Sequence, residues 1–112
     1  MPSTHSDTLA ELRRQFVAQL PARIDAINTL ARSLEVAGWD ASDVDTLHRL
    51  VQNLTNSAGI FGMPSVADVA RSLEARLAAL LKAGAAPTRA DWQAILADFD
   101  HMERQIRMLL AP

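Results

Sequence analysis

Polar and small residues in one mid-chain segment share a spacing that places them on a single side of a helix. They are Asp45, His48, Arg49, Gln52, Asn56 and Gly59. At 3.6 residues per turn, all of them lie within about 60° of Gln52. An imidazole such as that of His48 can act as a nucleophile near neutral pH, and a carboxylate three residues earlier can orient it. This polar face is where the sequence offers chemistry.

The helix that carries the polar face must bury its opposite side. Apolar residues recur there three or four positions apart, the period of one helical face. They are Leu47, Leu50, Val51, Leu54, Ala58 and Phe61. Ser42 and Asp45 form a capping box that opens the helix, and Gly62 closes it. The sequence therefore predicts an amphipathic helix between Ser42 and Gly62.

Two helices are predicted before this segment. A short leading helix should span 6–19, because Thr8 and Glu11 form a capping box ahead of an apolar repeat. Pro21 suits a first helical position and should start a second helix, which ends at Gly38. Trp39 is expected to fold back over the end of the bundle.

Two more helices follow, one from Pro64 to Gly84 and one that begins at a Thr88–Asp91 capping box. Because the connections are short, consecutive helices should be antiparallel neighbours. We expect an all-α fold, an antiparallel up-and-down four-helix bundle with the short N-terminal helix capping one end. Residues 1–112 are interpreted as a single domain, which can be a module of a longer chain.

Composition excludes several classes of function. The 112 residues carry a net charge of −2 without a basic run, so nucleic acid is not an expected partner. Without cysteine there is no disulfide framework or thiolate metal site. No apolar run approaches the length of a membrane span, and the first residues lack a secretory signal. We expect a cytoplasmic protein that binds no membrane.

Two Asp-x-x-His pairs, Asp45 with His48 and Asp98 with His101, are similar to the Glu-x-x-His pairs that hold metal ions in some helical bundles. Metal ligands in such bundles project into the core. Helical phase places Asp45 and His48 away from the apolar side, and His101 roughly opposite the apolar stripe of the last helix. We therefore expect no metal site and no cofactor.

The end of the central helix contains several weak helix formers in succession. Thr55, Asn56, Ser57 and Gly59 lower its intrinsic stability, and Gly59 alone costs roughly 1 kcal/mol relative to alanine. Small residues there either let a neighbouring helix approach closely or leave a flat spot on the surface beside Gln52. The same phase count places the apolar residues Ile60 and Met63 partly outward, at the border of this spot.

This segment resembles the signature of histidine-containing phosphotransfer (HPt) domains. The run is Gln52-x-Leu54-Thr55-Asn56-Ser57-Ala58-Gly59-Ile60-Phe61-Gly62, followed by Leu73-Glu74. The family pattern reads His-x-Leu-Lys-Gly-Ser-Ala, then a glycine and a Leu-Glu pair in the next helix. The residues that match are Leu54, Ser57, Ala58, Gly62, Leu73 and Glu74. The resemblance implies a short helix leading a four-helix bundle, over essentially the whole chain.

The resemblance also places Gln52 at the position of the phosphorylated histidine, Thr55 at that of the lysine and Asn56 at that of the glycine. A histidine ring nitrogen offers a lone pair to phosphorus, whereas the amide nitrogen of glutamine is delocalised into its carbonyl. Gln52 is either an engineered substitution or natural degeneracy, and the two accompanying departures favour degeneracy. His48, one turn before Gln52, is the weaker alternative as a phosphoacceptor.

We therefore predict a non-catalytic pseudo-phosphotransfer module rather than an enzyme. Its expected partner is the receiver domain of a response regulator or a histidine kinase of a two-component pathway. The residues expected to contact it are Asp45, His48, Arg49, Gln52, Thr55, Asn56, Gly59, Ile60 and Met63.

Two alternatives remain open at this stage. One is a competent phosphorelay protein, seen as a Gln52 variant or using His48. The other is a structural bundle that dimerises through Ile60 and Met63, although we expect a monomer.

Overall fold

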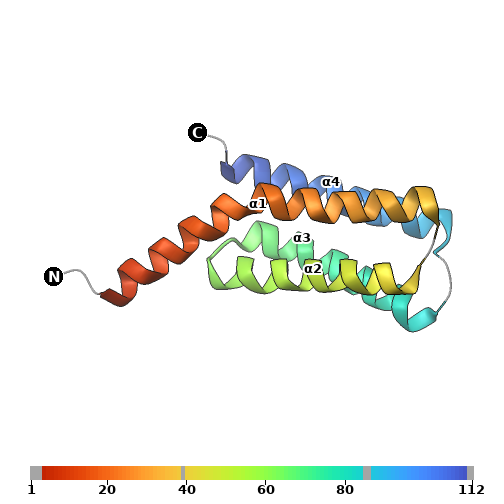
Figure 1. Cartoon of the computed structure of the whole chain (residues 1–112), viewed down its shortest axis with the longest axis horizontal. Helices are drawn as coiled ribbons and strands as arrows, with labels where there is room; N and C mark the ends of the chain where they lie inside the picture. The colour runs from red at the N-terminus through yellow and green to blue at the C-terminus, as the bar shows by residue number, and fades with distance from the viewer. Residues whose placement is uncertain (1–3, 39, 85–86, 111–112) are drawn as a thin grey trace.

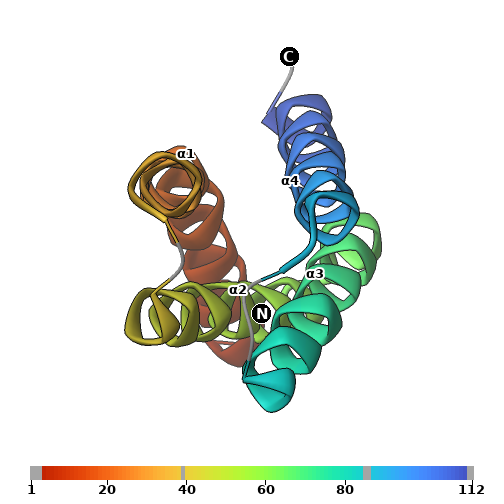
Figure 2. The same ribbon diagram turned by 90° about the vertical axis from the view of Figure 1, so that its right-hand side faces the viewer.

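The computed structural model describes residues 4–38, 40–84 and 87–110, with side chains from Thr8 onward. These residues form four helices and no strand, and the helices run up and down around a common axis (Figures 1 and 2). This confirms the predicted all-α four-helix bundle. Trp39, which was expected to fold over the bundle end, lies outside the described residues. The elements are α1 (Thr4–Ala37), α2 (Ala41–Ile60), α3 (Pro64–Ala83) and α4 (Arg89–Leu110).

The prediction of a separate short helix at the N-terminus is wrong. α1 continues without a break through Pro21. Phe16 and Leu20 before the proline and Ile24 after it are all buried, at intervals of four residues, so one apolar face continues across the proline. The fixed φ of proline is close to the helical value, and only one backbone hydrogen bond is lost. α1 bends near its middle in Figure 1, as expected for a helix with an internal proline.

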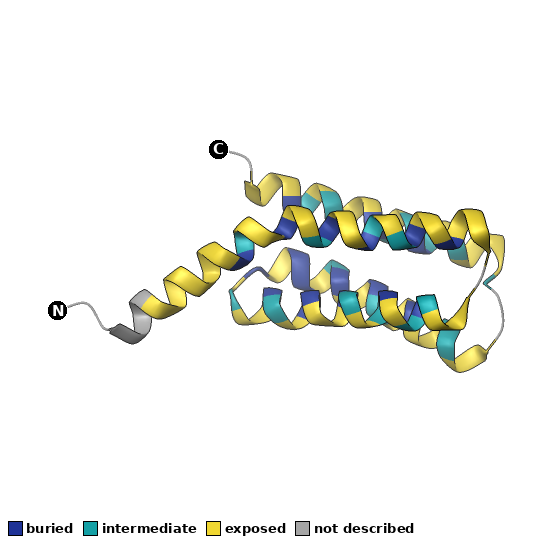
Figure 3. Ribbon diagram, in the orientation of Figure 1, coloured by how far each residue is buried: buried dark blue, intermediate teal, exposed yellow. Residues whose placement is uncertain are grey.

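The N-terminal part of α1 also does not cap the bundle. Residues 8–15 are all exposed, and Leu9 and Leu12 each keep nearly half of their surface in solvent. Figure 3 shows this segment projecting past the end of the other helices. Two contacts join its base to the turn after α2. The Arg13 Nε donates a hydrogen bond to the Phe61 carbonyl oxygen at 3.1 Å, and the Phe16 and Phe61 rings stack with centroids 5.1 Å apart.

Side-chain caps mark the N-terminal ends of α2 and α4. The Asp40 carboxylate caps α2 by accepting hydrogen bonds from the backbone amides of Ser42 and Asp43 at 2.8 and 3.3 Å. The N-cap of α2 is therefore Asp40 and not the predicted Ser42. The predicted box at Thr88 and Asp91 is confirmed, since each side chain accepts from the other's amide at 3.1 Å.

The apolar sides of the four helices meet in one core, in which α2 packs most extensively against α3. Figure 3 shows these buried residues along the inner faces of the helices. None of the helices in the described ranges is long and apolar enough to span a membrane. The largest side chains that are almost completely buried are Leu20, Ile27, Leu47, Leu54, Leu73, Leu77, Ile95 and Met102.

Shortening a core side chain should destabilise the bundle far more than shortening a leucine of the projecting segment. We expect Leu77→Ala to lower the free energy of unfolding by about 2–5 kcal/mol, because Leu77 is fully buried and the substitution leaves a cavity. Leu9→Ala removes the same atoms from an exposed position and should change it by less than about 0.5 kcal/mol. Urea denaturation followed by circular dichroism measures both, and equal losses would contradict this packing.

Candidate functional site

α2 presents most of the predicted polar face to solvent. Arg49, Gln52, Asn56 and Gly59 are exposed, and Asp45 and His48 are half-buried. Leu47, Val51, Leu54 and Ala58 on the other side of the helix have no exposed surface. Ile60 ends the helix at the border of the polar face and keeps 69% of its surface exposed. We call the outward residues Asp45, His48, Arg49, Gln52, Asn56, Gly59 and Ile60 the α2 face.

Thr55 does not belong to this surface, although it was predicted to contact a partner. It is 6% exposed, and its Oγ1 donates a hydrogen bond to the Val51 carbonyl oxygen of its own helix at 3.0 Å. Its position around the helix is about 60° from Gln52. This is the edge that α3 covers, because Thr55 shares a hollow there with Glu74 and Ala75 of α3.

Met63 was expected to point partly outward, and this is wrong as well. It is 3% exposed and belongs to the core. The expectation extended the helical phase beyond Ile60, where α2 ends. Gly62 takes a positive φ of 70°, which reverses the chain, and the Met63 amide then donates to the Ala58 carbonyl oxygen at 2.8 Å. The dimerisation surface predicted from Ile60 and Met63 therefore keeps only Ile60 exposed.

The polar side chains of the α2 face pair differently from the prediction. Asp45 was expected to orient the His48 ring, but its Oδ2 lies 3.0 Å from an Arg49 guanidinium nitrogen. Within the described ranges, no hydrogen bond or ion pair joins the side chains of Asp45 and His48, and none involves the side-chain amide of Gln52. Gln52 is thus presented to solvent without a partner in the described part of the fold.

Two hollows lie on either side of Asn56, which lines both of them. The first, between α1 and α2, has a volume of about 580 Å³. The second, between α2 and α3, has a volume of about 650 Å³ and includes Arg71 and Glu74. The α2 face is therefore a ridge with a depression on each side, rather than a flat surface. The first hollow is lined by residues that include Ala22, Arg23, Ala26, Asn53, Asn56 and Ser57.

The part that α1 plays in this site was not predicted. Arg23 lies about thirty positions before the HPt-like segment, and α1 was considered only for its buried side. The available signal was the pair of alanines at positions 22 and 26 on either side of it, one helical turn apart. Small side chains at that spacing leave room along a helix for another group.

Asp98 and His101 form no site with other metal-binding residues. The Asp98 Oδ2 pairs with the Arg76 Nε of α3 at 2.7 Å, so this carboxylate joins two helices and is not merely on a solvated face. His101 is exposed, with its ring next to the Gln105 amide at 3.4 Å. Over the ranges that the structure describes, no three His, Cys, Asp or Glu side chains gather in a metal-binding group.

Gly59 is not required by the packing of this chain. A Cβ atom at this position would lie more than 4 Å from the described atoms beyond its chain neighbours and the adjacent backbone of its own helix, and its φ is not positive. We expect Gly59→Ala to raise the free energy of unfolding by about 0.5–1 kcal/mol, because alanine loses less backbone entropy in a helix. Gly62→Ala is the matched control and should destabilise, since its φ of 70° strains a residue with a Cβ. Thermal unfolding of both variants tests this, and a destabilised Gly59→Ala would contradict it.

Of three comparisons with known proteins, only the one with family models gave a match. Neither the curated proteins nor the solved structures gave a significant match. The family model for the Hpt domain matches residues 11–111, which is nearly the whole chain. Hpt domains are phosphotransfer carriers of two-component phosphorelays, and they interact with receiver domains and histidine kinases. A bundle of four helices and a match over this length show that the chain belongs to the Hpt domain family.

Proposed function

We propose that this Hpt domain is a pseudo-phosphotransfer module, which docks a receiver domain or a histidine kinase without accepting phosphate. The observation that carries the proposal is the glutamine at position 52, which the resemblance aligns with the phosphoacceptor histidine of the family pattern. A glutamine amide nitrogen has no free lone pair for attack on phosphorus. A domain with this residue can present the family's docking surface but cannot relay a phosphoryl group from it.

The burial pattern supports this register of the motif. Leu54, Ala58 and Leu73, which match apolar positions of the family pattern, have no exposed surface. Gln52 is exposed on the same helix. A phosphoacceptor must be reached by a partner's active site, so its position should be an outward one. Moving the motif by one turn to start at His48 would lose its serine, alanine and glycine matches.

The neighbours of Gln52 support natural degeneracy over a single substitution. Thr55 stands at the lysine position of the pattern and, being uncharged, supplies no cation for a phosphoryl group. Its hydroxyl donates instead to the Val51 carbonyl oxygen. Asn56 replaces the glycine and puts a side chain on the ridge beside position 52. Both changes keep the helix and remove features that phosphotransfer would use.

His48 is a poor substitute for the missing histidine. It is half-buried about 6 Å from Gln52 along the helix, one turn closer to the N-terminus. The carboxylate of Asp45, which was expected to orient its ring, is paired with Arg49 instead. An imidazole without that support has no arrangement that favours it as a nucleophile.

The α2 face nevertheless retains what docking requires. It combines the exposed apolar side chain of Ile60, the small residue Gly59 and the guanidinium of Arg49. Interfaces draw their affinity from a few anchors of this kind within a complementary shape. The exposed amide of Gln52 can enter a concave acidic site and donate hydrogen bonds there.

The proposal predicts no phosphate on the unmodified chain. Incubated with a phosphorylated receiver domain or an autophosphorylated histidine kinase of the same organism, wild type and His48→Ala should both remain free of acid-labile phosphate. Phosphate on the wild type that is lost in His48→Ala would assign the relay to His48 and contradict the proposal. Gln52→His then tests the scaffold: labelling shows that only the nucleophile is missing, whereas no labelling implicates Thr55 and Asn56 as well.

Charge reversal on the α2 face should weaken docking. We expect Arg49→Glu to raise the Kd for a receiver domain by about tenfold, because it brings a negative charge against carboxylates. Arg104→Glu on α4, which does not pack against α2, makes the same charge change and should leave the Kd within twofold. Titration calorimetry compares the two, and equal affinities for wild type and Arg49→Glu would count against this face.

A further inference from the structure

The hollow between α1 and α2 combines an apolar floor with a polar rim. Ile27 and the half-buried Leu50 lie at its floor, and Ala22 and Ala26 leave its volume unfilled. Its other lining residues include Asn53, Asn56 and Ser57, together with Arg23. The asparagine and serine side chains can donate hydrogen bonds, the guanidinium only donates them and is positively charged, and none of the lining residues is acidic. The hollow therefore favours a group that accepts hydrogen bonds and carries negative charge.

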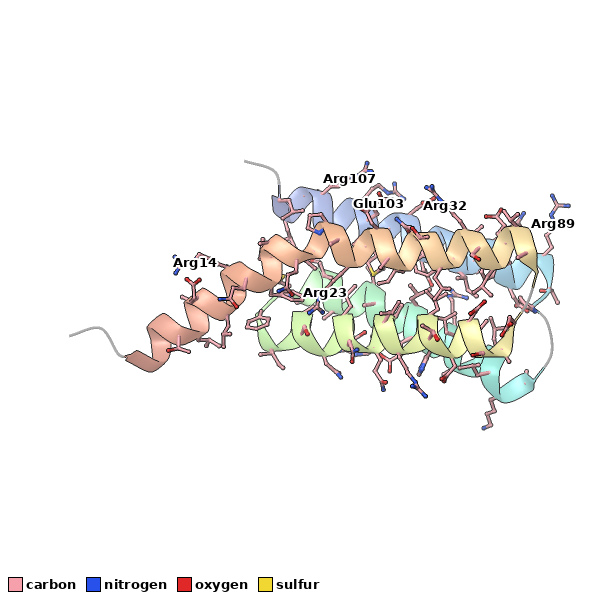
Figure 4. The ribbon with its side chains drawn as sticks, viewed as in Figure 1. Arg14, Arg23, Arg32, Arg89, Glu103 and Arg107 are labelled. Carbon is pink, nitrogen blue, oxygen red and sulfur yellow. The ribbon has the colours of Figure 1, made fainter. Side chains whose placement is uncertain are left out.

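The side chain of Arg23 is positioned by an aromatic ring and a neutral amide, and not by a carboxylate. Its guanidinium carbon lies 5.3 Å from the centroid of the Phe16 ring, and its NH2 donates to the Gln19 Oε1 at 3.4 Å. Figure 4 shows the side chain between α1 and α2. No ion pair in the described part of the chain includes it. By contrast, carboxylates pair with Arg14, Arg49, Arg71, Arg76 and Arg107.

Two other hollows on the surface have their charge already balanced. The hollow between α2 and α3 contains Glu74 beside Arg71, and Arg71 pairs with Asp68 at 3.2 Å. The hollow between α3 and α4 contains Arg76, which pairs with Asp98 at 2.7 Å. An anion entering either would meet a carboxylate. Of these three hollows, the one at Arg23 is therefore the one with an uncompensated positive charge.

We infer that this hollow anchors an aspartate or glutamate side chain of the protein that docks on the α2 face, with Arg23 as its cationic partner. A guanidinium can bind a carboxylate through two parallel N–H···O bonds, and its stacking on Phe16 limits the entropy lost in doing so. Asn56 lines the hollow and also belongs to the α2 face, so one partner can reach both. The inference rests on the proposed docking function and adds the chemistry that the partner must carry.

Two arginines of α1 give a matched test. Arg23→Gln and Arg32→Gln each remove one positive charge from the same helix, and Arg32 does not line the hollow. The probe is a purified receiver domain of the same organism that binds the wild type in titration calorimetry. We expect Arg23→Gln to raise its Kd at least tenfold at low salt and less at high salt, whereas Arg32→Gln changes it by less than twofold. Equal effects of the two variants would overturn the inference.

Further variants exclude a folding defect and locate the anchor. Arg23→Lys keeps the charge and should lose less affinity than Arg23→Gln, while circular dichroism checks that all variants keep the wild-type helix content. Arg23→Glu should abolish binding, and exchanging one acidic residue of the receiver for lysine should restore it. If no single exchange restores binding, the direct pair with Arg23 is refuted.

The outcomes separate this inference from the docking function. If Arg49→Glu weakens binding but Arg23→Gln does not, docking stands and the anchoring hollow is refuted. If no receiver domain or histidine kinase binds the wild type, both are refuted. Succinate alone serves as the small-molecule probe: micromolar binding that Arg23→Gln removes would make the hollow a site for free carboxylates and overturn the assignment to a docked protein.

Discussion

The rotation of α2 about its own axis is the constraint on which the rest of this molecule depends. Leu47, Val51 and Leu54 have no exposed surface, and they hold one side of the helix against its neighbours. Burying each such side chain contributes about 1.5–3 kcal/mol, so a different rotation would be costly. Once this side is fixed, the residues opposite it are necessarily presented to solvent. Gln52 is exposed for that reason, whatever chemistry its side chain can perform.

Under the function proposed above, this division between core and surface allows a phosphotransfer fold to persist without a phosphoacceptor. The apolar positions that match the HPt pattern are buried in the core, whereas Gln52 and Asn56 are exposed. Surface substitutions of this kind usually change stability by less than about 0.5 kcal/mol. The relay chemistry can therefore be lost while the docking surface is kept. Gly59, around which the described residues leave open space, is consistent with the proposed docking surface.

α1 makes the site a feature of two helices and not of α2 alone. Arg23 forms one rim of the hollow beside Asn56 and stacks on Phe16. Phe16 in turn stacks on Phe61, immediately after α2, and Arg13 binds the Phe61 carbonyl. These contacts run from the projecting end of α1 to the turn that follows the α2 face. The rim of the proposed docking surface thus depends on where α1 lies.

The sequence by itself determined the helical class, most helix boundaries and the outward position of Gln52, because apolar periodicity fixes the angle of each residue around its helix. Only the tertiary structure decided what lies beyond a single helix. Thr55 is buried because α3 covers its edge, and Met63 because the turn at Gly62 redirects the chain. α1 passes through Pro21 because burial on both sides of the proline outweighs one lost hydrogen bond. Periodicity along one segment contains no information about which neighbour approaches it.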